Sequence, residues 1–186
     1  MKILLTGCCG FIGFNFVNSL VKTNKKIKIV GIDNLNNYYS VGLKKARLKI
    51  LLKSKNFTFQ KMDLENLKLL NNLFKKNKFD CIFHLAAQAG VRYSIKNPKK
   101  YIDSNIIGFF NIIELARKTN IKKIFYASSS SVYGDSKKFP LKEKTIINPK
   151  NTYGLTKKFN EELAEVYSNY YDINFVGLRF FTVYGE

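Results

Sequence analysis

The stretch MKILLTGCCGFIGFNFVNSLVKTNKKIKIVGID, residues 1–33, sets the frame for the rest of the chain. An apolar run of strand length ends at Thr6, an apolar helical pattern begins at Phe11, and a second apolar run ends on Asp33. Between the first run and the helix, glycines recur at Gly7, Gly10 and Gly13. The order strand, glycine loop, helix, strand and acid is the context in which a glycine pattern predicts a dinucleotide site.

Each loop glycine has an expected physical role. Gly7 permits the tight turn, Gly10 lets the backbone approach a pyrophosphate, and Gly13 lets the helix pack close to the strand. The pyrophosphate would lie on the free N–H groups of the helix N-terminus. Asp33 would accept hydrogen bonds from the adenosine ribose and repel a 2′-phosphate, which favours NAD over NADP. Because the spacing is G-x-x-G-x-x-G rather than G-x-G-x-x-G, a glycine-rich turn in an ordinary α/β domain is the alternative.

The remaining chain alternates between strand and helix patterns. Strands are expected at residues 57–62, 79–85, 121–128 and 173–179, and helices at 40–53, after Asp63 as N-cap, at 100–118 and at 152–170. This alternation predicts one α/β domain with a doubly wound parallel sheet covered on both faces. Ligands of such sheets bind beyond the carboxyl ends of the strands. Asp63, Ala86, Ala87 and the serines at 128–131 fall there.

Composition narrows the class of protein. The chain of 186 residues is 46% hydrophobic, as expected for about one globular domain. No apolar run has membrane-spanning length, so we expect no transmembrane helix and no membrane partner. The three cysteines predict no disulfide framework and favour a reduced, cytoplasmic location. Cys8 and Cys9 are interpreted as small residues filling the glycine loop, with a redox role as the alternative, and no metal site is expected.

The net charge of +19 raises the question of nucleic-acid binding. Only four of the 32 basic residues are arginines, and the lysines are scattered rather than gathered in one motif. The abundance of Lys, Asn and Ile is typical of A/T-rich codons. We therefore interpret most lysines as solvated surface and expect no nucleic-acid partner.

Tyr153 and Lys157 form a Tyr-x-x-x-Lys pair, which places both side chains on one helix face. A tyrosine with its ordinary pKa of about 10 is a poor base at neutral pH. A nearby ammonium and the positive nicotinamide of NAD+ would lower that pKa. Tyr153 could then take a proton from a hydroxyl while hydride leaves the same carbon. Lys157 could bond the nicotinamide ribose, and a hydroxyl from residues 128–131 could hold the substrate oxygen.

With these motifs in place, the chain resembles the extended short-chain dehydrogenase/reductases, in the nucleotide-sugar epimerase/dehydratase group and nearest to the uronate epimerases. The resemblance rests on residues 6–13 (TGCCGFIG), 33–39 (DNLNNYY), 84–94 (HLAAQAGVRYS), 103–108 (DSNIIG), 127–134 (ASSSSVYG), 153–157 (YGLTK) and 178–185 (LRFFTVYG). It implies that residues 1–186 form an NAD-binding Rossmann domain. The implied reaction is epimerisation at C4 of a UDP-sugar, UDP-glucuronate to UDP-galacturonate, through a transient 4-keto sugar.

The resemblance also assigns residues. The implied catalytic residues are Ser129, Tyr153 and Lys157, and Ser130, Ser129 and Arg92 would contact the substrate. The implied cofactor-binding residues are Gly7, Gly10, Phe11, Ile12, Gly13, Asp33, Asn34, Asp63, Leu64, Ala86, Ala87, Tyr153 and Lys157. Related dehydratases and decarboxylases carry acidic residues after the catalytic serine, so the serines here favour simple epimerisation.

Two other polar residues stand close to these motifs. Asn105 would lie behind the catalytic centre, and its alternative role is that of a satisfied polar residue in helix packing. His84, the only histidine, is interpreted as a packed strand residue.

The family pattern continues beyond residues 178–185 with a proline and a C-terminal region that binds the nucleotide diphosphate, whereas here Glu186 follows Gly185. The resemblance thus implies that most of the substrate-binding part is missing, and that this chain alone turns over UDP-sugars poorly or not at all. Two alternatives stay open: another nucleotide-sugar dehydratase, decarboxylase or reductase, and a non-catalytic NAD-binding domain.

The family's dimers also imply a homodimer through the helices that hold Asn105 and Tyr153. The apolar residues that would serve this contact are Ile106, Phe109, Phe110 and Ile113. The same pattern also fits packing against the sheet.

Overall fold

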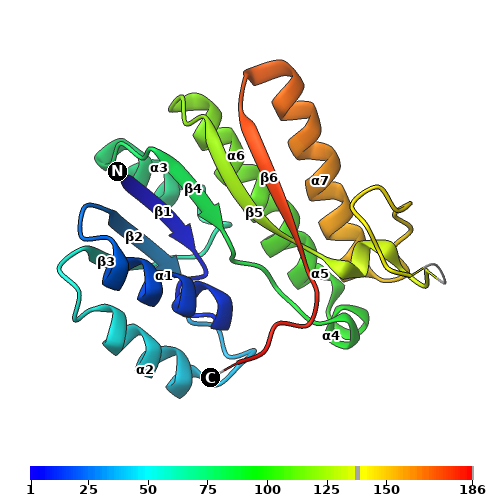
Figure 1. Cartoon of the computed structure of the whole chain (residues 1–186), viewed down its shortest axis with the longest axis horizontal. Helices are drawn as coiled ribbons and strands as arrows, with labels where there is room; N and C mark the ends of the chain where they lie inside the picture. The colour runs from blue at the N-terminus through cyan, green and yellow to red at the C-terminus, as the bar shows by residue number, and fades with distance from the viewer. Residues whose placement is uncertain (137–138, 186) are drawn as a thin grey trace.

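Six parallel strands form a single sheet in the computed structural model, which describes residues 1–136 and 139–185 (Figure 1). The strands are β1 (Lys2–Thr6), β2 (Lys28–Asp33), β3 (Phe57–Lys61), β4 (Cys81–His84), β5 (Lys123–Ser129) and β6 (Asn174–Phe180). Their order is β3-β2-β1-β4-β5-β6, with Leu4 of β1 opposite Val30 on one side and Ile82 on the other. The predicted doubly wound parallel sheet is confirmed.

Side chains alternate between the two faces of the sheet, as the pleat requires. Leu4, Val30 and Ile82 belong to one buried apolar cluster, whereas their neighbours Ile3 and Ile29 belong to a second cluster on the opposite face. Because both faces are covered, the strands are apolar at consecutive positions rather than at alternate ones.

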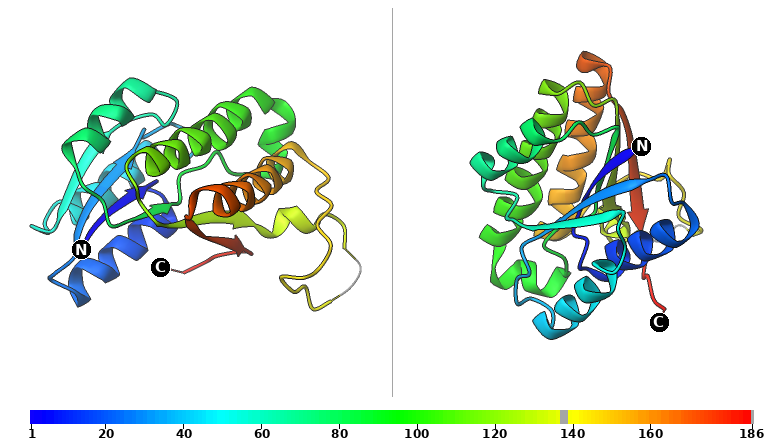
Figure 2. Two further views of the ribbon diagram at one scale, coloured as in Figure 1. Left: turned by 90° about the horizontal axis from the view of Figure 1, so that it is seen from above. Right: turned by 90° about the vertical axis from the view of Figure 1, so that its left-hand side faces the viewer.

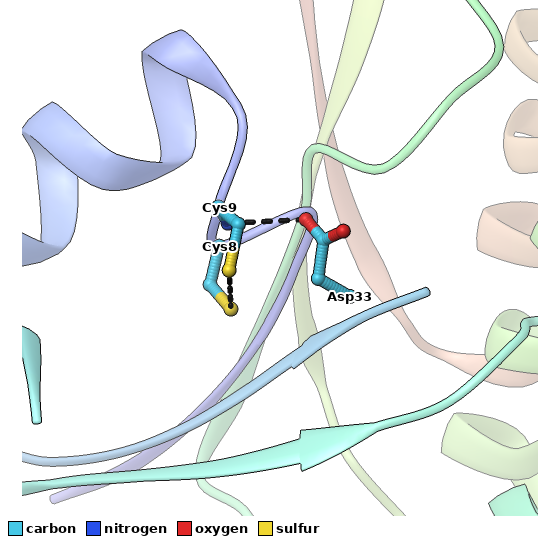
Figure 3. A group of neighbouring side chains, drawn as sticks. All are labelled: Cys8, Cys9 and Asp33. Carbon is cyan, nitrogen blue, oxygen red and sulfur yellow. Dashed lines mark hydrogen bonds between the residues drawn. The ribbon is translucent and has the colours of Figure 1, made fainter. Parts of the chain in front are cut away.

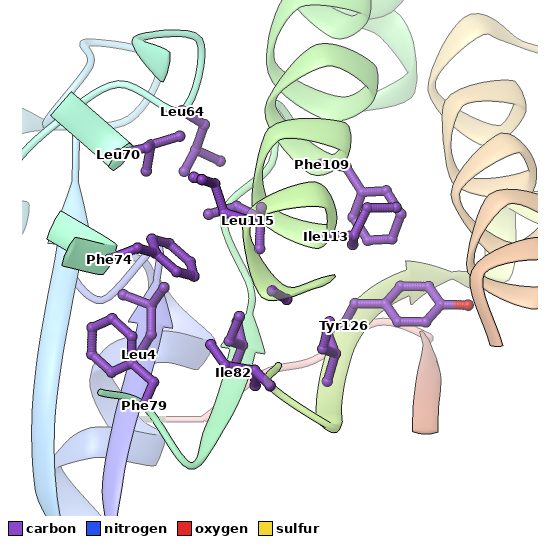
Figure 4. Packing of buried hydrophobic residues seen from close by; sticks show 14 of the residues in the cluster. Leu4, Leu64, Leu70, Phe74, Phe79, Ile82, Phe109, Ile113, Leu115 and Tyr126 are labelled. Carbon is purple, nitrogen blue, oxygen red and sulfur yellow. The ribbon is translucent and has the colours of Figure 1, made fainter. Parts of the chain in front are cut away.

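Helices cover both faces (Figure 2). On one face lie α3 (Leu67–Lys76), α6 (Gly108–Lys118) and α7 (Thr152–Tyr171), and on the other lie α1 (Phe11–Thr23) and α2 (Val41–Leu51). Figure 4 shows the larger cluster, in which Phe74 of α3 and Phe109 of α6 pack over Ile82 and Tyr126. Phe109 and Ile113, two of the residues considered for a dimer contact, belong to this core.

The helix predicted at 100–118 is longer and less regular than expected. It begins with α5 (Pro98–Tyr101), continues as a π-helical segment, Ile102–Ile107, and ends as α6. A short helix, α4 (Val91–Lys96), precedes it and was not predicted, because six residues carry too little periodicity. Asn97 ends α4 before Pro98, since the residue before a proline avoids the helical conformation.

The expected N-cap of α3 was wrong. The helix begins at Leu67, and Asn66 caps it by accepting a hydrogen bond from the backbone N–H of Leu69 at 3.1 Å. Asp63 lies one turn earlier, where its backbone carbonyl accepts from the N–H of Asn66. Both residue types cap helices well, so the sequence alone did not separate them.

The strand order indicates where on the sheet a ligand would bind. β1 lies between β2 and β4, so the direction of winding reverses there, and ligands of doubly wound sheets bind at such a reversal. β5 runs on into a 3₁₀ turn, Ser130–Tyr133.

No helix in the described part of the chain is long and apolar enough to cross a membrane. Glu186, where the chain departs from the family pattern, lies outside the described residues.

Candidate active site

A groove of about 350 Å³ follows the carboxyl edge of the sheet. Every residue that the sequence assigned to cofactor binding lines it: Gly7, Gly10, Phe11, Ile12, Gly13, Asp33, Asn34, Asp63, Leu64, Ala86, Ala87, Tyr153 and Lys157. Ser129 also lines it. One cavity therefore brings together the glycine loop, the acid at the end of β2 and the Tyr-x-x-x-Lys pair, which are up to 150 residues apart in sequence.

The three loop glycines differ in what a side chain would meet. Gly7 has a positive φ of 74°, and a Cβ there would lie 2.8 Å from the backbone of Ala86. A Cβ on Gly13 would lie 2.2 Å from the carbonyl oxygen of Gly7. A Cβ on Gly10 would meet only that same oxygen, at 3.3 Å. The fold itself thus requires Gly7 and Gly13, whereas Gly10 leaves room open toward the groove.

The N-terminus of α1 faces this open room. Gly10 is its N-cap and has no side chain to satisfy the first N–H groups of the helix. The first turn of any helix leaves such groups without intrahelical partners, and they attract anions. The loop therefore fits a phosphate-bearing ligand such as a dinucleotide.

Asp33 is held at the end of β2 by the backbone around it. One carboxylate oxygen accepts from the N–H of Cys9 at 3.0 Å and the other from the N–H of Leu35 at 2.9 Å. The residue is only 8% exposed, yet it lines the groove. Since each carboxylate oxygen has a second lone pair, Asp33 retains the capacity to accept from ribose hydroxyls.

The Tyr153–Lys157 pair is positioned by the start of α7. Asn151 caps the helix by accepting from the N–H of Gly154 at 2.8 Å. Gly154 allows close packing, because a Cβ there would lie 2.5 Å from the carbonyl oxygen of Ser131. Lys157 is buried, and its ammonium donates to the carbonyl of Ala127 at 2.8 Å. The Lys157 Nζ atom lies 6.0 Å from the centroid of the Tyr153 ring.

The electrostatics of this pair differ from the expectation. Burial raises the pKa of Tyr153, and a hydrogen bond with Ser129 acts in the opposite direction. Burial also lowers the pKa of Lys157 to about 8. The expected lowering of the Tyr153 pKa by Lys157 is thus not found in the chain alone, because desolvation of the phenolate dominates and the ammonium bonds the Ala127 carbonyl.

The serines at the end of β5 have separate partners. The Ser129 hydroxyl accepts from the N–H of Ser131 at 3.1 Å, beside its contact with Tyr153. Ser128 donates to a carboxylate oxygen of Glu161, which also binds the Arg179 guanidinium. Ser130 does not line the groove.

Arg92 also lies away from the groove. It is exposed on α4 and is not among the residues that line the cavity. The structure therefore brings Ser129 to the candidate site but neither Ser130 nor Arg92.

Asn105 links three parts of the structure behind Tyr153. Its amide accepts from the N–H of Gln88 at 2.7 Å and donates to the Gln88 carbonyl at 3.0 Å and to the Thr156 hydroxyl at 3.1 Å. Thr156 in turn donates to the carbonyl of Tyr153. Asn105 is buried on the π-helical segment, so the satisfied polar residue anticipated as an alternative is what the structure contains.

His84 is buried inside the sheet, as predicted. Its Nδ1 atom shares a hydrogen bond with the Thr6 hydroxyl at 3.1 Å, and its ring meets that of Phe109 edge-on. Burial and the nearby Lys157 lower the pKa of His84 to about 3, so the ring is neutral at physiological pH.

Several groove residues were not assigned from the sequence. Tyr38, Tyr39 and Lys44 line it near Asp33, and Phe180, Phe181 and Val183 close the end nearest β6. Lys44 is buried and donates to the backbone and side-chain oxygens of Asn36 at 3.0 and 2.9 Å. Tyr38 and Tyr39 lie in the quoted segment DNLNNYY, whereas nothing in the sequence distinguishes Lys44 from the many surface lysines.

Comparison with known proteins agrees with this geometry. Residues 4–186 match the family model described as GDP-mannose 4,6 dehydratase. The chain belongs to this family. Within the GDP-mannose 4,6 dehydratase family model, the match covers the glycine loop, the Tyr153–Lys157 pair and all six strands except the first residues of β1.

Two curated relatives align with the whole chain. The chain is 51% identical to Protein CapI of Staphylococcus aureus and 43% identical to UDP-glucuronate 4-epimerase 4 of Arabidopsis thaliana, with 100% of this chain aligned in each case. It spans 55% and 42% of those proteins, about half the length of the curated relatives it matches.

A solved structure shows the same likeness. The UDP-glucuronic acid 4-epimerase of Bacillus cereus, in complex with UDP-glucuronic acid and NAD, superposes with a TM-score of 0.89 at 36% identity, covering 100% of this chain and 58% of that one. The expected kinship with nucleotide-sugar epimerases and dehydratases is confirmed.

Proposed function

We propose that this chain is the cofactor-binding and catalytic part of an NAD-dependent enzyme that inverts C4 of a UDP-sugar, converting UDP-glucuronate into UDP-galacturonate. One observation carries the proposal: Tyr153, Lys157 and Ser129 line the same groove as the glycine loop and Asp33. The similarity to UDP-glucuronate 4-epimerases of Arabidopsis thaliana and Bacillus cereus supports the choice of sugar.

The fit to NAD rests on the chain's own atoms. The α1 N-terminus would hold the pyrophosphate above Gly10, and the Asp33 carboxylate would accept from the adenosine ribose hydroxyls. NADP would place a second anionic group beside Asp33, so NAD is the expected form. Lys157, fixed by the Ala127 carbonyl, would donate a second hydrogen bond to the nicotinamide ribose.

The proposed chemistry uses the hydroxyls at the end of β5 and the start of α7. NAD, when bound, supplies a hydride acceptor and a positive ring near Tyr153. Tyr153 takes the proton of the sugar 4-hydroxyl and returns it after the 4-keto sugar has turned over. Ser129 donates to the same sugar oxygen. Because burial raises the Tyr153 pKa, the base form depends on the positive ring as well as on Ser129.

Product analysis tests this proposal. The chain is incubated with NAD and labelled UDP-glucuronate, and the nucleotide sugars are separated over time. We expect UDP-galacturonate, formed slowly, at a rate that falls by about 10²–10⁴-fold in Tyr153→Phe. A UDP-pentose would instead indicate a decarboxylase. A 4-keto-6-deoxy sugar formed from UDP-glucose in a parallel incubation would indicate a dehydratase. NAD binding without oxidation of any UDP-sugar would identify a non-catalytic NAD-binding domain.

We also propose that the chain forms a homodimer through α7 and the α5–α6 helix. Ile102, Ile107 and Phe110 are exposed on the α5–α6 helix, and Leu155, Phe159 and Val166 are exposed on α7. α7 packs beside α5 and the Ile102–Ile107 segment (Figure 2), so we infer that these side chains form one apolar face. An apolar face of this kind on a sheet-covering helix pair favours association with a second copy.

A further inference from the structure

Two cysteines and one aspartate form a compact buried group under the glycine loop (Figure 3). The ligand atoms of Cys8, Cys9 and Asp33 all lie within 4.8 Å of one another. Among residues 1–136 and 139–185, this is the single group of three or more His, Cys, Asp or Glu residues close enough to hold a metal ion. This group was not expected from the sequence, because Asp33 is 24 residues away from Cys9.

The separation of the two sulfurs suits a tetrahedral ion. The Sγ atoms lie 3.8 Å apart. Two thiolates bound to one Zn²⁺ at about 2.3 Å with a tetrahedral angle are also about 3.8 Å apart. In the metal-free chain the two thiols share a hydrogen bond across this distance. An ion can therefore replace the shared proton without a change in the distance between the two sulfurs.

One feature next to these ligands, the N-terminus of α1, attracts negative charge. The cysteines lie directly before α1, and the partial positive charge of a helix N-terminus stabilises thiolates. Asp33 supplies an oxygen ligand from the neighbouring strand end, and its carboxylate already faces the loop through its bond to the Cys9 N–H. With the two thiolates, this carboxylate would complete a set of three ligands whose atoms lie within 4.8 Å of one another.

We propose that Cys8, Cys9 and Asp33 bind one thiophilic divalent cation, of the chemical class of Zn²⁺ and Cd²⁺. Both thiols give up their protons to solvent as the two metal–sulfur bonds form, and no electron is transferred. Two sulfur ligands and one oxygen ligand suit an ion that prefers tetrahedral coordination by sulfur, nitrogen and oxygen.

A second consequence rests on the proposed function. The Asp33 carboxylate would serve both the ion and the adenosine ribose, so the ion and NAD would exclude each other. Under this proposal the glycine loop binds either the dinucleotide or the thiophilic ion, and such an ion inhibits cofactor binding.

The first experiment titrates the reduced chain with Cd²⁺ and follows the ultraviolet charge-transfer band of cadmium thiolates. We expect one Cd²⁺ per chain in the unsubstituted protein, and none in Cys8→Ala or Cys9→Ala. Cys81→Ala is the matched control, because Cys81 is equally buried in the same apolar cluster but lies on β4. One ion retained by the Cys8→Ala/Cys9→Ala double variant, or no 1:1 binding at all, overturns the proposal.

A measurement on the unsubstituted chain guards against variants that fail to fold. X-ray absorption of the Zn²⁺-loaded protein should show two sulfur neighbours at about 2.3 Å and oxygen neighbours at about 2.0–2.2 Å. A first shell of oxygen and nitrogen alone contradicts the site.

The second experiment measures NAD affinity with and without one equivalent of Cd²⁺. We expect NAD affinity to fall at least tenfold with Cd²⁺, and this effect to vanish in the double variant. Cysteine-dependent Cd²⁺ binding by a chain that does not bind NAD would support the metal site and count against the proposed function. NAD binding by a chain that does not bind Cd²⁺ would support the proposed function and overturn the metal site.

Discussion

The glycines at 7, 10 and 13 show how much of the site is dictated by single residues. Gly7 and Gly13 are enclosed by the chain's own backbone, whereas Gly10 has a single neighbour at 3.3 Å. A glycine that its own fold does not require points to something outside the fold, and the open α1 N-terminus indicates an anion. The two kinds of glycine predict different effects of substitution.

Gly13→Ala should destabilise the chain. The new Cβ would lie 2.2 Å from the Gly7 carbonyl oxygen, so the loop and α1 must move apart. We expect a loss of about 1–3 kcal/mol in the free energy of unfolding, measured by urea denaturation. Gly42→Ala is the control, because its nearest neighbour would be 3.6 Å away in a helix that prefers alanine. A Gly13→Ala chain as stable as the parent would contradict the packing described.

Lys157 should make stability depend on pH. Its pKa is about 8 in the folded chain and near 10.5 when unfolded, so the unfolded chain binds more protons between these values. The free energy of unfolding therefore rises by about 3 kcal/mol in total as pH increases from about 8 to 10.5. Below pH 8, Lys157 is charged in the folded chain, and the full cost of burying that charge is present.

A comparison with Lys157→Met isolates the pH-dependent contribution of Lys157 to the free energy of unfolding. Methionine has a similar length and no charge, so its loss of the bond to the Ala127 carbonyl shifts stability equally at every pH. Urea unfolding at pH 7–10.5 should show the parent gaining relative to Lys157→Met as pH rises. A constant difference between the two proteins would rule out a buried, pKa-shifted ammonium.

At the scale of helices and strands, caps and turns decide where the reactive side chains lie. Asn151 lies two residues before Tyr153 and caps α7, because its side chain accepts a hydrogen bond from the Gly154 N–H. Gly154 itself packs closely against the carbonyl of Ser131. The first turn of α7 is thereby fixed against the end of β5, where Ser129 lies. The cap is thus one of the contacts that determine the position of Tyr153.

Asn151→Ala should cost about 1 kcal/mol in the free energy of unfolding, because one N–H of the first turn loses its partner. It should also lower the rate of any Tyr153-dependent oxidation. Asn66→Ala removes the cap of α3 and should cost a similar amount of stability without affecting that rate. Equal effects of the two variants on the reaction would show that the α7 cap has no special link to the site.

The sequence predicted elements better than it predicted their ends and contacts. Apolar periodicity located the strands and the long helices, because buried faces leave a strong pattern. It did not reveal the π-helical segment at Ile102–Ile107, which ends where Gly108 packs closely against Leu64. It also misplaced the α3 cap, since Asp63 and Asn66 both suit that role.

The candidate site was predictable where a motif fixed the spacing. The glycine loop, Asp33 and Tyr153 lie at the groove because parallel strands end at one edge. Tertiary contacts decided the rest: Lys44 is buried through its bonds to Asn36, and Arg92 is exposed on a helix that was not predicted.

At the scale of the whole molecule, the apolar face on the α5–α6 helix and α7 predicts self-association. Phe110→Lys should shift the chain from dimer to monomer in sedimentation velocity, because it places a charge within that face. Ile50→Lys is the control, since Ile50 is similarly exposed but lies on α2, on the opposite face of the sheet. A monomeric parent chain, or a dimer unaffected by Phe110→Lys, would contradict this interface.

The central claim is that the glycine loop binds the pyrophosphate of NAD. Isothermal titration of NAD into the chain and into Gly10→Ala tests it most directly, with circular dichroism confirming that both are folded. We predict that the parent binds NAD and that the Gly10→Ala methyl group, placed where the phosphates approach, weakens binding at least tenfold, or about 1.4 kcal/mol. A folded parent without affinity for NAD, or equal affinity in both proteins, would contradict the account.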